Sequence, residues 1–99
     1  MAIRTSNGKK VNGIVFDKLS NGQMEYESNW KDGVLDGIKK YWFENGQLQY
    51  ERSVKNGKQD GLERTWHFNG RLISEANFTE GNLISKKCWD EEGNKIECD

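Results

Sequence analysis

The sequence lacks the features that mark membrane-spanning, exported and nucleic-acid-binding proteins. No stretch approaches the ~18 consecutive apolar residues of a transmembrane helix, and residues 1–6 have no apolar segment of the kind a signal peptide needs. Its 15 Lys and Arg nearly balance its 16 Asp and Glu, giving a net charge of −1, which does not favour nucleic acid or an anionic membrane as a partner. We therefore expect a cytoplasmic protein.

Residues with catalytic and metal-binding chemistry are also scarce. The one histidine, His67, has no Cys or Asp partner at ligand spacing, so a structural or surface role is expected. There is no Ser/His/Asp arrangement, no HExxH and no glycine loop of the phosphate-binding type. Two acidic pairs, Asp32 with Asp36 and Asp60 with Glu63, lie beside turn glycines, and turn formation explains them better than cation binding. We expect no enzyme activity, no cofactor and no metal.

What the chain does contain is unusual for one compact core. Its 99 residues are only 33% apolar and 31% charged, and a chain of this size and polarity would bury too little surface around one core. Four Trp, three Tyr and four Phe nevertheless argue against disorder. A thin, extended sheet that carries an aromatic stripe reconciles the two observations.

Internal repetition organises the sequence. A short Asn-Gly cassette recurs every 24 residues, at residues 21–24, 45–48 and 69–72, and a fixed period of this length indicates a repeat architecture. Residues 1–99 are therefore interpreted as a single repeat domain. A degenerate start at 8–12 precedes repeats at 13–36, 37–60 and 61–84, and a truncated cap at 85–99 follows.

The repeat unit predicts β-hairpins. Asn-Gly is a strong hairpin-turn signal, because both residues tolerate positive φ. The segments between turns are about six to eight residues long and alternate with period two, and no segment shows helical spacing. We predict an all-β, elongated, single-layer antiparallel meander of seven or eight strands.

Alternation assigns most apolar side chains to one face of this sheet. A single layer cannot enclose such a face, so part of it should stay exposed or be covered by a second copy or a partner. Packing within the sheet is the alternative role for any one aromatic residue. The residues predicted to share the face are Ile14, Phe16, Met24, Tyr26, Trp30, Ile38, Trp42, Leu48, Tyr50, Val54, Leu62, Trp66, Leu72, Phe78, Trp89 and Ile96.

Two surfaces compete for the partner-binding role. On the apolar face, the candidate binding residues are Trp30, Trp42, Tyr50, Trp66, Phe78 and Trp89, since Trp and Tyr are favoured contact residues. The alternative is the charged strand face, with Lys39, Tyr41, Glu63 and His67.

The two cysteines and the two ends of the chain carry further expectations. Cys88 and Cys98 flank a predicted turn at residues 90–94, which brings them within disulfide reach. In a reducing cytoplasm both thiols would stay free, whereas a disulfide would staple the last hairpin and argue for export. Residues 1–20 carry a charge of +3 and residues 88–99 a charge of −4. These charges either protect the terminal strands from unwanted pairing or attract copies head to tail.

The cassette Tyr41-Trp-Phe-x-Asn-Gly-x-Leu-x-Tyr-Glu, followed by Lys-Asn-Gly-Lys-x-Asp-Gly at 55–61, resembles the bacterial variant of the MORN repeat, found in the YwqK-type antitoxin family. The resemblance covers residues 8–97. It implies an elongated sheet of stacked hairpins, no enzymatic activity and protein binding. Some relatives are thought to be immunity proteins that neutralise a toxin, and other MORN proteins are linked to membranes, lipids or scaffolding.

Three functions follow in order of expectation. The first is a non-enzymatic module that binds a protein partner, in the manner of an antitoxin or immunity protein that neutralises a toxin. The second is a structural, self-assembling scaffold whose copies form a homodimer face to face or stack end to end. The third is membrane or lipid association, for which four basic residues among the first twenty are too dilute.

Overall fold

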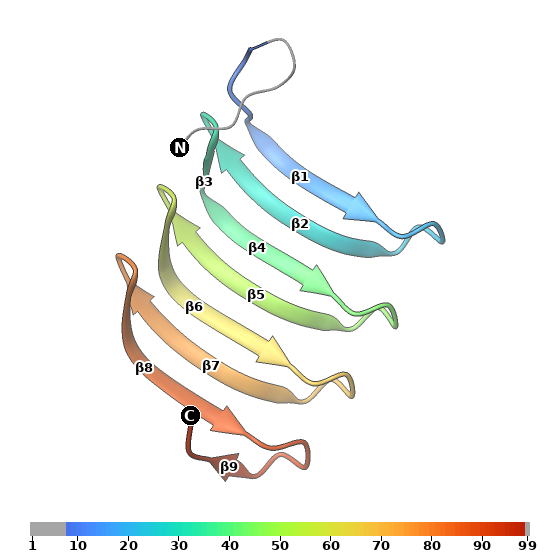
Figure 1. Ribbon diagram of the computed structural model, residues 1–99, viewed down its shortest axis with the longest axis vertical. Helices are drawn as coiled ribbons and strands as arrows, with labels where there is room; N and C mark the ends of the chain where they lie inside the picture. Colours follow the sequence, from blue (N-terminus) through green and yellow to red (C-terminus); the bar gives the residue numbers. More distant parts are fainter. Residues whose placement is uncertain (1–7, 99) are drawn as a thin grey trace.

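The computed structural model describes residues 8–98, which form one antiparallel sheet (Figure 1). The sheet measures 50 × 37 × 16 Å, and the predicted all-β, elongated, single-layer meander is confirmed. Arg4 and Asp99, which contribute to the predicted charges of the two ends, lie outside the described residues. The described part of the chain has no helix long and apolar enough to cross a membrane.

Neighbouring strands in the sheet are also neighbours in the sequence, apart from one short irregularity. The order is β1-β2-β4-β5-β6-β7-β8-β9, and β3 pairs with the end of β2 before the chain enters β4. The described chain has nine strands, against the seven or eight predicted, because it includes the two-residue strands β3 and β9. The strands are β1 (Gly13–Lys18), β2 (Met24–Lys31), β3 (Val34–Leu35), β4 (Gly37–Trp42), β5 (Leu48–Lys55), β6 (Lys58–Trp66), β7 (Leu72–Thr79), β8 (Asn82–Trp89) and β9 (Lys95–Ile96).

The short turns at one edge of the sheet connect successive hairpins. In the turn between β5 and β6, Asn56 and Gly57 both have positive φ, 51° and 81°, as the favoured two-residue hairpin turn requires. The amide of Gly57 donates a hydrogen bond of 2.8 Å to the carbonyl of Leu35, 22 residues upstream. The same bond recurs from Gly33 to Val11 and from Gly81 to Gln59. Each short turn is therefore held against the preceding unit.

The longer turns at the opposite edge explain the Asn-Gly cassettes. The Asn45 carboxamide oxygen accepts the Gln47 amide at 2.9 Å, which fixes the turn locally. Its nitrogen donates to the Phe68 carbonyl of the next turn at 3.1 Å, so one side chain both shapes a turn and links it to its neighbour. In the last turn Asp90 takes over the local role, and hydrogen bonds from backbone amides hold the pKa of its carboxyl below its usual range.

The buried part of the molecule is small and lies on one side of the sheet. Ser28 and Ala76 are 0% and 1% exposed, and both lie on the face that also carries Ser74 and Cys88. Val54, Ala76 and Cys88 are the buried apolar residues of the described chain. Because no second layer covers the sheet, its large side chains stay at least partly exposed.

The prediction that the apolar residues named above share one face is wrong. Ile38 pairs with Ser53, whereas Tyr41 pairs with Tyr50, so Ile38 and Tyr50 lie on opposite faces. A shift of one residue in register moves every side chain of a strand to the other side. The sequence alternation did not give the phase between neighbouring strands. It also breaks within a strand at the bulge beside each long turn, where Trp42 pairs with Leu48 next to the Tyr41–Tyr50 pair.

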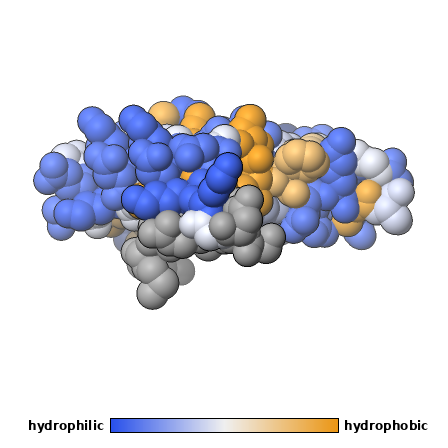
Figure 2. Space-filling view, turned by 90° about the horizontal axis from the view of Figure 1, so that it is seen from above, coloured by the Kyte–Doolittle hydropathy of each residue, from blue (hydrophilic) through white to orange (hydrophobic). Residues whose placement is uncertain are grey.

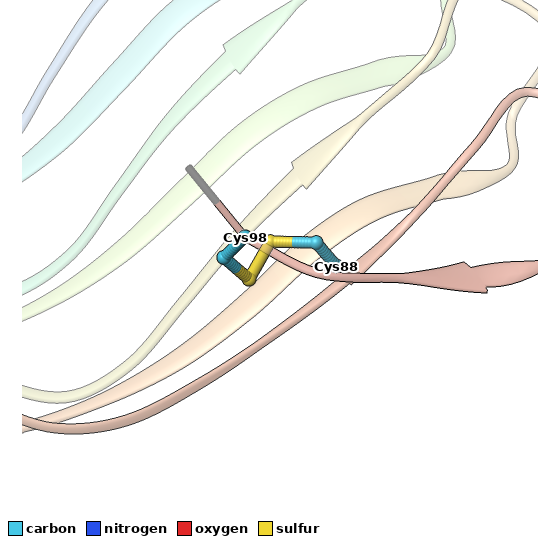
Figure 3. The surroundings of a disulfide bond; sticks show 2 residues. All are labelled: Cys88 and Cys98. Atoms are coloured by element: carbon cyan, nitrogen blue, oxygen red, sulfur yellow. A yellow bond between two sulfur atoms is a disulfide. The ribbon is translucent and has the colours of Figure 1, made fainter.

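A disulfide joins Cys88 of β8 to Cys98, which follows β9 (Figure 3). The two Cα atoms are 5.4 Å apart, on the same face of the sheet. The structure therefore differs from the expectation of two free thiols. The bond holds β9 against the last two residues of β8, where Cys88 pairs with Ile96 and Trp89 pairs with Lys95.

Candidate binding faces

Register pairing defines two different faces. The face that contains a row of tyrosines is here called the tyrosine face. One residue from every strand except β3 forms a line across it: Asp17, Tyr26, Tyr41, Tyr50, Thr65, Ser74, Cys88 and Ile96. The opposite face, here the ladder face, has a charged row: Glu27, Lys40, Glu51, Arg64, Glu75 and Lys87. Each member of the charged row is adjacent in sequence to a member of the tyrosine row, and successive side chains of a strand point to opposite sides.

Three tyrosines stack across adjacent strands of the tyrosine face. The ring centroids of Tyr26 and Tyr41 are 5.0 Å apart, and those of Tyr41 and Tyr50 are 6.0 Å apart, both pairs tilted by 51°. These separations are within the range of favourable aromatic pairs. Tyr41, in the middle, is 36% exposed. The three rings form a continuous aromatic surface that solvent reaches.

Cations cover this aromatic row. The Lys39 ammonium lies 5.9 Å from the centre of the Tyr26 ring and 5.4 Å from that of Tyr41, and the Arg52 guanidinium lies 5.5 Å from the centre of Tyr50. All three distances allow a cation–π attraction. Arg52 also pairs with Glu63 at 3.6 Å, whereas Lys39 makes no ion pair within 4 Å to any described residue. Lys39 is therefore a basic group beside the tyrosine row that remains available to an acidic partner.

A hydrogen-bond network fixes Tyr50. Its hydroxyl donates to Glu63 Oε2 at 2.7 Å and accepts from Arg52 Nε at 2.5 Å, and Gln59 donates to the same carboxylate oxygen at 2.9 Å. Partial burial, followed by the hydrogen bond to Glu63, raises the pKa of Tyr50 to about 12. The phenol is thus held neutral and in one orientation.

A shallow hollow lies beside the exposed ring. Tyr41, Gln49, Tyr50 and Thr65 line a cavity of about 340 Å³ that is open to solvent. Two aromatic walls with an amide and a hydroxyl suit the insertion of one side chain from a partner. In the described residues no group of three or more His, Cys, Asp or Glu is placed to hold a metal ion.

The ladder face has alternating charge. Arg64 bridges two acids from neighbouring strands, with Nε 2.8 Å from Glu75 and Nη1 3.5 Å from Glu51. Hydrogen bonding to Glu75 is the main cause that raises the pKa of Arg64 above its usual value. The same face exposes apolar side chains at the N-terminal end, where Ile14 is 58% and Phe16 is 52% exposed. Figure 2 shows the thin slab from that end, with hydrophobic residues among a mostly hydrophilic surface.

The structure divides the six predicted aromatic site residues between the two faces. Trp30, Tyr50 and Phe78 lie on the tyrosine face by register. The other three, Trp42, Trp66 and Trp89, directly follow residues of the tyrosine row, and strand alternation places them on the ladder face. All six are half-buried. They do not form one patch.

Sequence reasoning missed the aromatic row itself. Tyr26 was placed with the apolar side chains and Tyr41 with the charged ones, although the two rings stack. Pairing the segments on either side of each Asn-Gly turn would have found it, with allowance for the extra bulge residue, such as Gln49 opposite the Tyr41–Trp42 step. His67 occupies a turn position equivalent to Phe43, and its buried Nε2 has no hydrogen-bond partner among the described residues.

A comparison with known families finds a match for two segments of the chain. The family described as MORN repeat variant matches residues 35–56 and 59–80. Two segments of the chain are thus similar to this repeat. The first supplies Lys39, Tyr41 and Tyr50 to the tyrosine face, and the second supplies Glu63, which fixes Tyr50. No curated protein matches the chain, and no solved structure matches it.

Proposed function

We propose that the chain is a non-enzymatic module that binds a protein partner through the tyrosine face. The observation that carries this proposal is the row of Tyr26, Tyr41 and Tyr50, which is built largely by the MORN repeats and is partly open to solvent. Tyr and Arg are frequent energetic centres of protein interfaces. MORN repeat modules are typically protein-binding or scaffolding elements and are usually non-catalytic.

The shape and charge of the face suit a protein segment. The hollow beside Tyr41 is shallow and open, so it suits one side chain of a larger partner. Lys39 beside the rings favours a partner that presents an acidic group next to an apolar or aromatic one. Because Tyr50 is already fixed by Glu63 and Arg52, little side-chain entropy is lost there on binding.

A toxin as the partner is the finer form of this proposal. It comes from the sequence resemblance to YwqK-type antitoxins, and neutralisation would then follow from covering a functional surface of the toxin. Co-expression tests it separately: a captured partner that stops cell growth alone and does not do so together with this chain supports neutralisation. A partner harmless on its own contradicts the toxin assignment but leaves protein binding intact.

The experiment for the proposal compares adjacent residues on opposite faces. The wild-type chain and the variants Tyr41→Ala and Lys40→Ala are used to capture partners from a lysate of the native host, with folding checked by circular dichroism. We expect one protein to be retained by the wild type and by K40A and to bind Y41A at least ~10-fold more weakly. Capture that is unaffected by Y41A, or lost equally with K40A, contradicts the tyrosine face as the binding surface.

A further inference from the structure

The charged row of the ladder face alternates in sign over six strands. From β2 to β8 it contains Glu27, Lys40, Glu51, Arg64, Glu75 and Lys87, one residue per strand, and each neighbouring pair is a register pair. Adjacent strands are ~4.8 Å apart, so the row is a regularly spaced series of opposite charges. Arg64 is satisfied within the chain by two acids. Glu27, Lys40 and Lys87 make no ion pair within 4 Å to a described residue.

The row has an even number of charges that alternate in sign. If a second copy of the row is laid against it in reverse order, every acidic residue therefore faces a basic one. We propose that two copies of this chain pack ladder face to ladder face, with the order of their strands reversed. A two-fold axis parallel to the strands, between β5 and β6, generates this arrangement and gives the same contacts twice. Glu27 of one copy then faces Lys87 of the other, Lys40 faces Glu75, and Glu51 faces Arg64.

The same two-fold rotation also brings apolar residues of the two ladder faces opposite one another. Trp42 pairs with Leu48 and Trp66 pairs with Leu72 within each chain, close to the long turns. Reversal places Trp42 of one copy opposite Leu72 of the other, and Leu48 opposite Trp66. Met24 on β2 faces Trp89 on β8 in the same way. Each indole therefore meets a smaller aliphatic side chain, which favours interdigitation across the interface.

The charges also exclude the competing orientation. If the axis ran across the strands, both copies would keep the same strand order, and each acid would face an acid and each base a base. Like charges opposite one another are destabilising. The charged row of the ladder face thus favours the reversed orientation. It specifies the orientation of the second copy as well as the face to which it binds.

The size of the face is sufficient for a stable dimer. The two larger extents of the sheet are 50 and 37 Å. The area of a face with these dimensions is about twice the ~800 Å² that each partner contributes to a standard interface. The described residues include only three buried apolar side chains, so the monomer has almost no core of its own. A second sheet packed ~10 Å away would complete the two-layer architecture on which most domains depend. The tyrosine face points outward in this dimer, so the inference is independent of the proposed function.

Analytical ultracentrifugation of the purified chain over a wide concentration range tests the pairing. We expect the wild type to be a dimer that dissociates more readily as salt is raised, because part of the attraction is electrostatic. E27K and K87E each place like charges opposite one another, and each alone should weaken the dimer at least ~10-fold. Mixing the two restores both contacts, so the equimolar mixture should form a heterodimer.

The matched control is Lys86→Glu, which makes the same charge change on the same strand but on the tyrosine face. K86E should leave the dimer unchanged, and circular dichroism should show that all variants are folded. A wild type that stays monomeric at every concentration overturns the inference. So does a mixture of E27K and K87E that associates no better than either variant alone, because the rescue depends on the reversed order.

Discussion

Tyr50 donates its hydroxyl hydrogen to Glu63 across the β5–β6 pair, at 2.7 Å. The two residues come from different segments that match the MORN repeat variant, since residues 35–56 contain the phenol and residues 59–80 contain the carboxylate. The bond lies next to the Arg52–Tyr50 contact, and together these interactions anchor one end of the tyrosine row. One repeat thus supplies the aromatic surface, and the next holds it in place.

The raised pKa of Tyr50 predicts a loss of stability at high pH. Its pKa is about 12 when folded, against 10.0 ordinarily, so between these values the folded chain retains a proton that the unfolded chain has lost. This contribution to the free energy of unfolding is complete below pH 10 and disappears as the pH rises towards 12. Solvent screening at this half-buried site limits it to about 1 kcal/mol. In denaturant titrations from neutral to high pH, Tyr50→Phe should show a shallower decline than the wild type, and identical slopes would contradict the prediction.

Two glycines with positive φ should differ in their tolerance of a side chain. At Gly37, φ is 121° and a Cβ atom would lie 2.8 Å from the Cβ of Asn29, whereas at Gly81 φ is 86° and a Cβ would meet nothing within 4 Å. Gly81→Ala introduces backbone strain alone, about 1 kcal/mol. Gly37→Ala adds a steric clash and should cost about 3 kcal/mol. Urea unfolding of both variants measures the difference, and equal costs would show that the Asn29 contact is easily relieved.

Arg64 should stabilise the centre of the sheet. Arg64→Met removes the cation and leaves Glu51 and Glu75 flanking an apolar side chain, which should lower the free energy of unfolding by about 1 kcal/mol. Arg64→Lys keeps the charge but loses the planar fork that contacts both acids, so a smaller loss is expected. Both are measured by urea unfolding at equal protein concentration. The R64M effect should shrink in high salt, and an effect independent of salt would assign the loss to packing instead.

Reduction of the Cys88–Cys98 disulfide should loosen one end of the molecule. The bond closes a loop with a sequence separation of 10, for which chain entropy predicts up to about 3 kcal/mol of stabilisation. Only two register pairs hold β9 to β8, so Cys98→Ser should release β9 first. Hydrogen exchange followed by mass spectrometry should show faster exchange in residues 82–98 and no change in residues 37–60. Unchanged exchange in both segments would mean that strand pairing alone holds β9.

The local structure of this protein follows directly from its sequence. Asn45 and Gly46 predicted a turn because the Asn side chain bonds the backbone two residues on and Gly accepts positive φ, and both occur. The 24-residue spacing of such turns, with period-two segments between them, gave the strands and the single antiparallel layer. These features depend on contacts between residues close in sequence, so a linear pattern contains them.

The composition of each face was decided only by the tertiary structure. Whether Tyr41 lies beside Tyr50 or beside Glu51 depends on the register between strands, and one bulged residue reverses the outcome. The sequence therefore located the aromatic residues but divided them between faces incorrectly. The tyrosine row and the alternating ladder both arise from pairing across strands, because a side chain acquires its neighbours on a sheet from the strands on either side of it. Those neighbours are set by the hydrogen-bond register, which alternation within one strand does not encode.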